Sequence, residues 1–255
     1  MKKISAVIIA KNEEANLPRC LSSIKWVDEI IVIDSGSCDG TRAIAERAGA
    51  RVFDITWTGF GPAKQFGIGQ ATGDWILSLD ADEEIPLLLK DEITAALSTA
   101  SDYDGYFIPR ITMFLGRWIH HSGWYPDYVL RLFDRKKGTF DGAVVHEKVI
   151  IDGRAGYLKN NILHYSYPDL EHYLGKFNRY TTLGAEEAYR QGKEASLFDL
   201  IIRPPMAFIK HYFSKQGFRD GLEGFMISFL SSVAVMIKYA KLRDLYRREK
   251  GDRGK

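Results

Sequence analysis

The chain has 255 residues, of which 45% are hydrophobic and 27% charged, a composition that indicates a folded globular protein and excludes a disordered or fibrous one. Its formal net charge of +2 is too small for a general nucleic-acid binder, so we expect no nucleic-acid partner. Cys20 and Cys38 fall on different predicted elements without metal-site spacing, which indicates reduced thiols and a cytosolic location.

Strand-like and helix-like stretches alternate through the first hundred residues. Apolar runs predict strands at residues 4–10, 29–33, 51–54 and 75–79. Helical spacing predicts helices at residues 12–24, 42–48, 63–71 and 87–98. The first apolar run is shorter than a signal-peptide core and is closed by charged residues, so we expect a strand there. The alternation predicts an α/β protein with a Rossmann-like, doubly wound, mainly parallel sheet.

After residue 102 the sequence changes character. Residues 105–110 and 128–134 are rich in β-forming side chains, and aromatic stretches separate them. From residue 171 the pattern is helical to the end. We therefore expect a nucleotide-binding half at residues 1–102, a second half of the same domain at 103–170, and a helical C-terminal extension at 171–255.

Acidic side chains follow directly on the predicted strand at residues 75–79. The run DADEE at residues 80–84 cannot lie unpaired in a core, so we expect it at the carboxyl end of the strand, facing a cleft. Asp80 and Asp82 there supply the hard oxygen ligands that magnesium or manganese prefers when it carries a diphosphate. The alternative is an acidic N-cap for the helix that follows Pro86.

Asp34 ends the second predicted strand and is expected at the same edge of the sheet as Asp80 and Asp82. A carboxylate there can accept hydrogen bonds from a ribose or a base, so the three acids together predict a nucleoside-diphosphate binder. The sequence contains neither a Gly-x-Gly-x-x-Gly nor a Gly-x-x-x-x-Gly-Lys-Ser/Thr motif, which disfavours dinucleotide oxidoreductases and P-loop hydrolases.

Three stretches together resemble glycosyltransferase family 2: VIIAKNE at residues 7–13, IVIDSGSCDGT at 31–41 and GDWILSLDADE at 73–83. A second set resembles the branch with bacterial lipopolysaccharide core β-1,4-glucosyltransferases: WYPD at 124–127, RLF at 131–133, VHE at 145–147 and HYSY at 164–167. The resemblance implies a GT-A fold, an inverting hexose transfer, a nucleotide-diphospho-sugar donor, here UDP-glucose, and manganese or magnesium. It makes residues 1–102 the donor half and residues 103–170 the acceptor side.

The resemblance also implies roles for residues that match donor-binding positions: Glu13, Asp34, Lys64, Gln65, Asp80 and Asp82. Glu13 and Asp34 would contact the uridine, Asp80 the ribose or the sugar, and Asp82 the metal. Lys64 and Gln65 stand where the family often has a basic residue or an asparagine near the donor, and the glutamine departs from that pattern.

The catalytic base is expected in the pair His146 and Glu147, which takes the place of the family's acidic pair. We assign the base to Glu147 and a substrate contact to His146, because an inverting reaction needs one group to remove the acceptor's proton. Asp127 is the rival base, and its other reading is an Asx-turn after Pro126.

Three further residues have a functional and a structural reading. Trp124 is either a platform for a sugar ring or core. His164 is either an additional metal ligand, as in several GT-A proteins, or structural. Arg131 pairs either with phosphate or with a buried carboxylate.

Two other functions remain open at this stage. A sugar nucleotidyltransferase shares the sheet and the acidic ligands, but it favours a glycine-rich basic loop after the first strand, where this chain has AKNEE at residues 10–14. A nucleotide-sugar-binding regulatory or scaffold protein would keep the fold without catalysis.

The C-terminal extension is expected to lie on a membrane as a peripheral element. The uncharged run at residues 224–237 is shorter than the roughly 20 residues that span a bilayer, so we expect no transmembrane segment. Mixed apolar and basic residues at 201–213 and a basic tail suit interfacial helices on an anionic leaflet, and a helical cap on the sheet is the alternative. A lipid-linked saccharide acceptor at the inner face of the cytoplasmic membrane would fit this placement.

Overall fold

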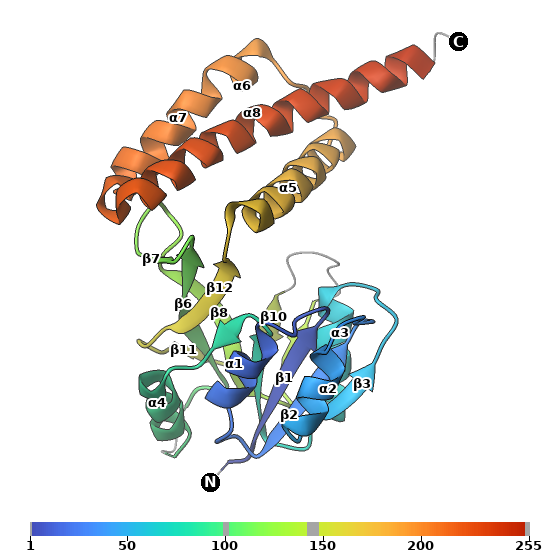
Figure 1. The fold of residues 1–255 in the computed structure, drawn as a ribbon, viewed down its shortest axis with the longest axis vertical. Coiled ribbons are helices and arrows are strands. Elements are labelled where there is room, and N and C mark those ends of the chain that lie inside the picture. Colours follow the sequence, from blue (N-terminus) through green and yellow to red (C-terminus); the bar gives the residue numbers. More distant parts are fainter. Residues whose placement is uncertain (1, 99–101, 142–147, 253–255) are drawn as a thin grey trace. The chain divides into compact units, whose positions relative to one another are not determined.

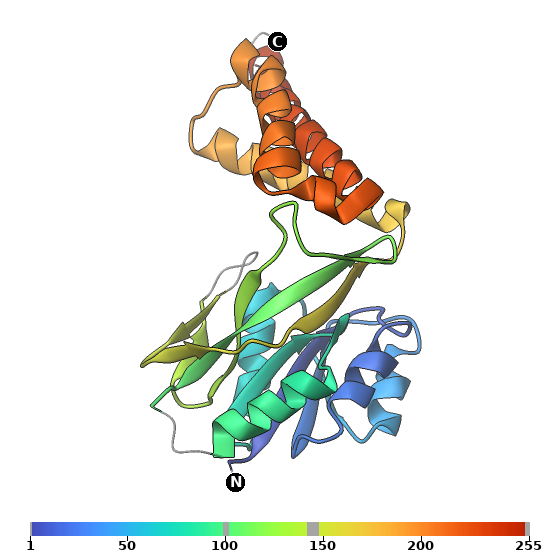
Figure 2. The same cartoon turned by 90° about the vertical axis from the view of Figure 1, so that its left-hand side faces the viewer.

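The computed structural model describes residues 2–98, 102–141 and 148–252, and the chain forms two compact units (Figures 1 and 2). The first unit comprises residues 1–111 and 127–165. The second comprises residues 112–126 and 166–255. The predicted division into a donor half at residues 1–102, an acceptor side at 103–170 and an extension at 171–255 also says where the two substrates bind. It stays a prediction.

Four parallel strands form one side of the main sheet: β1 (Ile4–Ala10), β2 (Glu29–Asp34), β3 (Arg51–Asp54) and β4 (Trp75–Asp80). They lie in the order β3-β2-β1-β4, with β1 between β2 and β4. The apolar side chains of β1 and β4 are almost entirely buried because helices cover both faces, as expected for a parallel sheet, whereas those of the edge strand β3 are half-buried. Ala10 is paired with Asp34 and Ile9 with Asp80, so the carboxyl ends of β2 and β4 meet at one edge.

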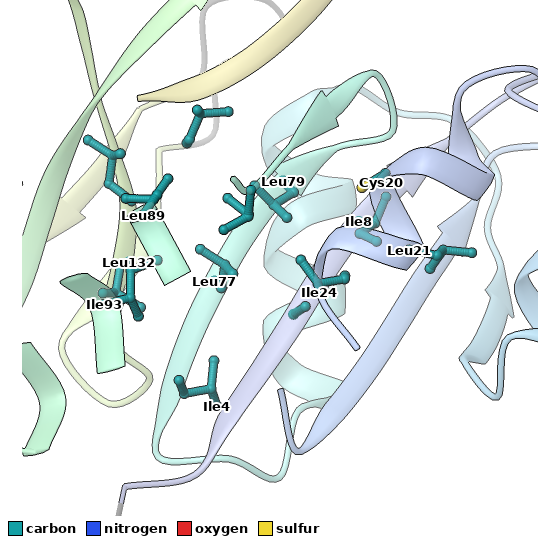
Figure 3. Close-up of a cluster of buried hydrophobic side chains, with 14 of the residues drawn as sticks. Ile4, Ile8, Cys20, Leu21, Ile24, Leu77, Leu79, Leu89, Ile93 and Leu132 are labelled. Carbon is teal, nitrogen blue, oxygen red and sulfur yellow. The ribbon is translucent and has the colours of Figure 1, made fainter. Parts of the chain in front are cut away.

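Four helices cover these strands: α1 (Leu17–Ser23), α2 (Thr41–Arg47), α3 (Phe60–Gln70) and α4 (Leu87–Ser98). One buried cluster joins apolar residues of α1 and α4 to Ile4, Ile8 and Leu77 (Figure 3). The other face holds α3 against Val7, Ile31 and Ile33. Helices on both faces confirm the doubly wound α/β arrangement.

Gly67 allows the close approach of α3 to the sheet. A Cβ atom at this position would lie 2.4 Å from Val7 Cγ1 and 3.1 Å from Ile33 Cγ1. Because no real Cβ tolerates the first of these distances, glycine is needed for this helix to pack on β1.

The predicted first helix begins later than its sequence pattern indicates. Asn12 has a φ of +56°, a left-handed conformation that an α-helix cannot contain, and Leu17 is the first helical residue. The side chain of Asn12 accepts a hydrogen bond from Cys38 N at 2.8 Å. Residues 12–16 therefore form a turn tied to the loop after β2.

Six further strands complete the sheet: β5 (Glu83–Glu84), β6 (Gly105–Phe114), β7 (Arg117–Ile119), β8 (Asp127–Asp134), β11 (Ala155–Tyr157) and β12 (Ile162–Tyr167). β11 is parallel to β6, whereas β8 pairs antiparallel with β4 and β6, β7 with β6, and β12 with β5. The order continues from β4 as β8-β6-β12-β5. β9 (Gly138–Phe140) and β10 (Val149–Ile151) form a separate antiparallel pair. β6 and β12 each contribute residues to both units.

Helices dominate the second unit: α5 (Leu170–Arg190), α6 (Leu197–Ile201), α7 (Arg203–Ile209), the π-turn η1 (Lys210–Ser214), the 3₁₀-turn η2 (Gly217–Asp220) and α8 (Gly221–Asp252). α5, α6 and α7 each pack along α8 (Figure 1). A capping box between Ser196 and Asp199 starts α6, and Pro204 and Pro205 lie in the first turn of α7, where their missing N–H groups cost little.

The last helix is long and apolar enough to cross a membrane by length and composition. Its most apolar window has a mean hydropathy of 1.5, and 17% of that window is buried in the structure. We expected no transmembrane segment because the uncharged run at residues 224–237 is short. That expectation stays a prediction, since α8 as a whole has 32 residues, which is long enough to span a bilayer.

Candidate active site

Asp80, the last residue of β4, is surrounded by cationic side chains. Its Oδ1 lies 3.0 Å from Lys64 Nζ, and its Oδ2 accepts a hydrogen bond from Arg131 Nη2. Burial alone would raise the pKa of Asp80, but Arg131, Lys64 and Arg110 hold that pKa well below its usual range. Asp80 is therefore an anion at neutral pH. Its side chain is 32% exposed, so the carboxylate can be reached from solvent.

Glu83 lies beneath Asp80 and is fully buried. Its Oε1 accepts hydrogen bonds from Arg110 Nη1 at 3.1 Å and Arg131 Nη2 at 2.9 Å, and its Oε2 accepts one from Asp80 N at 3.0 Å. Arg131 thus bridges the carboxylates of Asp80 and Glu83, so in this structure it pairs with a buried carboxylate, one of the two alternatives considered for it. Glu83 begins a strand rather than capping α4, so the acidic-cap alternative does not describe it.

Sequence reasoning assigned no site role to Glu83 or Arg110. One signal was available, because Arg110 interrupts an otherwise apolar β-forming run, and a charge inside such a run needs a buried partner. Arg110 also donates two hydrogen bonds to Asp127 Oδ2, from Nε at 3.0 Å and from Nη2 at 2.7 Å. The rival base Asp127 is therefore held in an ion pair.

Asp82 and His164 come together where β5 pairs with β12. His164 is the pairing partner of Glu83, and Tyr165 N donates a hydrogen bond to Asp82 O at 2.9 Å. Asp82 Oδ2 lies 3.3 Å from His164 Nε2, and the two side chains are 17% and 14% exposed. A carboxylate oxygen is a ligand that manganese prefers, and an imidazole nitrogen this close can bind the same divalent ion.

Asp82 and His164 could hold a divalent ion if phosphate oxygens and water supply its other ligands. Among residues 2–98, 102–141 and 148–252 no group of three or more His, Cys, Asp or Glu side chains is placed to hold a metal. Metal ions that carry diphosphates are commonly held by one or two protein groups, with phosphate oxygens and water filling the remaining positions. Asp82 and His164 have that arrangement.

The loops after β1 and β2 are joined by hydrogen bonds at the same edge. Asp34 Oδ1 accepts from Gly36 N, Ser37 N and Ser37 Oγ at 2.8–3.1 Å, so it organises the turn that follows it. Glu13 N donates to Thr41 Oγ1 at 2.7 Å, and Glu13 Oε2 accepts from Asn16 Nδ2 at 2.9 Å. The predicted uridine contacts Glu13 and Asp34 thus belong to two connected loops.

The remaining predicted residues have separate environments. Gln65 Oε1 accepts a hydrogen bond from Phe140 N at 2.9 Å and so supports β9. Trp124 belongs to the second unit, where its ring lies edge-on to Phe114 with centroids 5.8 Å apart. His146 and Glu147 lie outside the described residues, so their roles stay predictions.

Comparison with known proteins decides the family. A model described as Glycosyl transferase family 2 matches residues 5–159, which is more than half of the chain. The chain belongs to glycosyltransferase family 2. This confirms the resemblance seen in the sequence, and the mixed, mainly parallel sheet with its C-terminal helices confirms the predicted α/β GT-A class.

Relatives of this glycosyltransferase cover nearly its full length. An uncharacterized glycosyltransferase of Rickettsia felis is 34% identical over 96% of this chain and 90% of its own. The lipopolysaccharide core biosynthesis glycosyltransferase LpsC of Rhizobium meliloti is 32% identical over 94% of this chain and 91% of its own.

Two solved structures match this chain to different extents. Glucosyl-3-phosphoglycerate synthase of Mycobacterium tuberculosis in complex with UDP is 30% identical over 46% of each chain, with a TM-score of 0.37. Staphylococcus aureus TarS 1-349 in complex with UDP-GlcNAc is 16% identical over 97% of this chain and 92% of its own, with a TM-score of 0.49.

Proposed function

We propose that this glycosyltransferase is an inverting, metal-dependent enzyme that moves a hexose, glucose from UDP-glucose, to a lipopolysaccharide-core or other lipid-linked saccharide. The acceptor class is supported by the relative named as a lipopolysaccharide core biosynthesis glycosyltransferase, which matches 94% of this chain. We place the enzyme at the cytosolic face of the membrane, where such an acceptor is reached from a soluble donor.

The observation that carries the proposal is the position of Asp82 beside His164 at the carboxyl end of β4. These two side chains would hold the metal, and manganese or magnesium bound there would neutralise charge on the departing diphosphate. The carboxylate oxygen of Asp82 matches the preference of manganese and magnesium, and the imidazole nitrogen of His164 favours manganese of the two. The carboxyl edge of a parallel sheet is where ligands of this fold class bind.

The cations around Asp80 fix its charge and its direction. Lys64 and Arg131 approach its two oxygens from different elements, so the ionised carboxylate keeps one orientation in which it can accept a hydrogen bond from a ribose or sugar hydroxyl. Inversion also needs a base that takes the proton from the attacking acceptor hydroxyl, and we propose Glu147 for that role. Asp127 is less suited, because its Oδ2 already accepts two hydrogen bonds from Arg110.

The proposal is tested by measuring UDP release from UDP-glucose with extracted lipopolysaccharide core as acceptor, with manganese and with a chelator. We expect turnover with manganese, loss of turnover in chelator, and loss of both turnover and manganese-dependent UDP binding in Asp82→Ala. Glu46→Gln, an exposed change on α2, is the control and should behave as wild type. Full activity of Asp82→Ala in chelator contradicts the metal role, and UDP binding without release under any of these conditions favours a non-catalytic binding protein.

A further inference from the structure

An exposed aromatic cluster covers the turns between α7 and α8. The ring of Tyr212 lies within 5.1–6.2 Å of the rings of Phe208, Phe213, Phe218 and Phe225, measured between centroids. Phe229 extends the cluster along α8 by stacking on Phe225. We call these six residues the aromatic surface: Phe208, Tyr212, Phe213, Phe218, Phe225 and Phe229.

These rings are close together and yet remain open to solvent. Phe213, Phe218 and Phe229 are 58%, 51% and 52% exposed. Further large apolar side chains of residues 197–222 are at least 44% exposed: Leu197, Phe198, Ile201, Ile202, Met206, Ile209 and Leu222. Soluble monomers rarely leave so many neighbouring apolar side chains uncovered, so this part of the second unit has the character of a contact surface.

Charge is distributed unevenly over the same segment. Residues 197–236 contain three acids, and each is turned to a partner inside the unit. Asp199 accepts a hydrogen bond from Ser196 and pairs with Arg203 at 2.8 Å. Asp220 accepts hydrogen bonds from the loop at residues 120–122, and Glu223 pairs with Arg117 at 3.7 Å. The other three lysine and arginine residues of the segment are exposed: Lys210, Lys215 and Arg219.

The combination of apolar rings and exposed cations favours a lipid bilayer over a second copy of this chain as the contact partner. Aromatic and aliphatic side chains interleaved with lysine and arginine are suited to the boundary between lipid headgroups and acyl chains. A second copy of this chain would bring Lys210, Lys215 and Arg219 towards the same cations on its partner, and like charges in a contact oppose association.

A membrane-spanning α8 is opposed by its bonds to α5. Lys241 Nζ donates to Asn178 Oδ1 at 2.7 Å and to Thr181 Oγ1 at 2.9 Å, and the hydroxyl of Tyr189 donates to Glu249 at 2.7 Å. A spanning α8 would either break these bonds or take the charged side chains of α5 into hydrocarbon, where each is costly.

We propose that the aromatic surface inserts into one leaflet of an anionic bilayer, with α6, α7 and the first half of α8 lying in the interface and Lys210, Lys215 and Arg219 contacting lipid phosphates. The proposal deepens the membrane association within the proposed function and rests on it. It adds that apolar insertion, more than the basic tail, holds the enzyme on the lipid.

The two contributions separate in a vesicle-flotation experiment on the full chain without sugar donor or acceptor. Wild type is mixed with phosphatidylcholine vesicles, with or without 30% phosphatidylglycerol, at 0.1 M and 1 M NaCl. Salt screens exposed charges but leaves apolar insertion intact. We expect tighter binding to the anionic vesicles at 0.1 M, and residual binding to both kinds of vesicle at 1 M.

Variants identify the groups responsible. Phe213→Ser with Phe218→Ser should weaken binding to both kinds of vesicle by at least tenfold, because exposed rings contribute little to folding but much to insertion. Lys210→Gln, Lys215→Gln and Arg219→Gln together should remove only the advantage of anionic vesicles. The matched control is Leu87→Ser with Leu88→Ser on α4, where 67% and 70% of the two residues are exposed, and it should bind as wild type.

Three results would overturn the proposal: no wild-type binding to either vesicle, complete loss of binding at 1 M NaCl, or unchanged binding of the double phenylalanine variant. A concentration-dependent dimer that disappears in that variant would also overturn it, because the occupant would then be a second copy. UDP release from UDP-glucose with lipopolysaccharide core is measured separately on the same protein preparations. Wild type that releases UDP but binds no vesicles counts against the lipid surface alone, and wild type that binds vesicles but releases no UDP counts against the proposed function alone.

Discussion

At the residue scale, the contacts of Arg110 bear on one of the two candidate bases, Asp127. Its guanidinium holds Asp127 Oδ2 through two hydrogen bonds and reaches the buried Glu83 with a third. A carboxylate in such a fork is oriented and charge-compensated, which suits a structural or positioning role better than acceptance of a proton. Glu147 remains the base predicted from the family pattern.

We therefore predict that Glu147→Gln lowers kcat by about a hundredfold or more, the usual size of a general-base contribution, and leaves donor affinity near wild type. The amide keeps the shape of the side chain and loses the ability to take a proton. Steady-state kinetics and UDP-glucose titrations on Glu147→Gln, Asp127→Asn and the control Glu46→Gln provide the measurement. A larger kcat loss in Asp127→Asn than in Glu147→Gln would reverse the assignment.

The predicted strands at the element scale correspond closely to the observed ones. β1 and β3 have the predicted bounds, because polar residues close the apolar stretch of each strand at both ends. The apolar spacing predicts a helix from residue 12, whereas α1 begins at Leu17. Apolar spacing carries no information about the left-handed backbone at Asn12. Local side-chain to backbone hydrogen bonds of this kind compete with helix formation.

The proximity of Asp82 and His164 depends on an element that the sequence pattern does not reveal. β5 has two residues, too few for any periodicity, and its pairing with the distant β12 places His164 beside Asp82. The motif predicted an acidic side chain at the edge of the sheet. His164 was expected as a metal ligand only from the family resemblance, because its position depends on tertiary pairing. Arg110 and Glu83 were missed for the same reason, because their partners are distant in sequence.

The loop at residues 120–122 is attached to the start of α8 through Asp220. The buried carboxylate accepts hydrogen bonds from His120 N at 3.2 Å, His121 N at 2.8 Å and Ser122 Oγ at 3.3 Å, and it contacts His121 Nδ1 at 3.0 Å. Trp124 follows this loop directly, so Asp220 orders the segment that carries the predicted sugar platform.

We predict that Asp220→Asn weakens this attachment by about 1–3 kcal/mol, because an amide nitrogen would face backbone donors that then lose their acceptor. Hydrogen exchange at the amides of His120 and His121 should become at least about tenfold faster through local opening. Asp244→Asn, which removes an exposed ion pair with Arg248 on the same helix, is the control and should leave both rates unchanged. Unchanged exchange in Asp220→Asn would show that the loop is held by other contacts.

At the scale of the whole molecule, two kinds of surface coexist in one chain. The first unit carries the acidic edge of the sheet, and the second carries the aromatic surface with its basic border. Composition alone indicated neither, because a net charge of +2 averages over an acidic site and a basic helical segment. The C-terminal helices were predicted from their pattern, but the exposure of their aromatic side chains follows from packing, which sequence periodicity does not specify.

The proposed function depends most on a divalent ion that carries the diphosphate and is held between Asp82 and His164. Pulsed electron paramagnetic resonance of the full chain with manganese and UDP tests this directly, since a coordinated imidazole nitrogen couples to the manganese spin. We expect a nitrogen coupling in wild type that disappears in His164→Gln and persists in His211→Gln, a variant of a histidine in the second unit. Tight manganese-dependent UDP binding by wild type without any nitrogen coupling would contradict it.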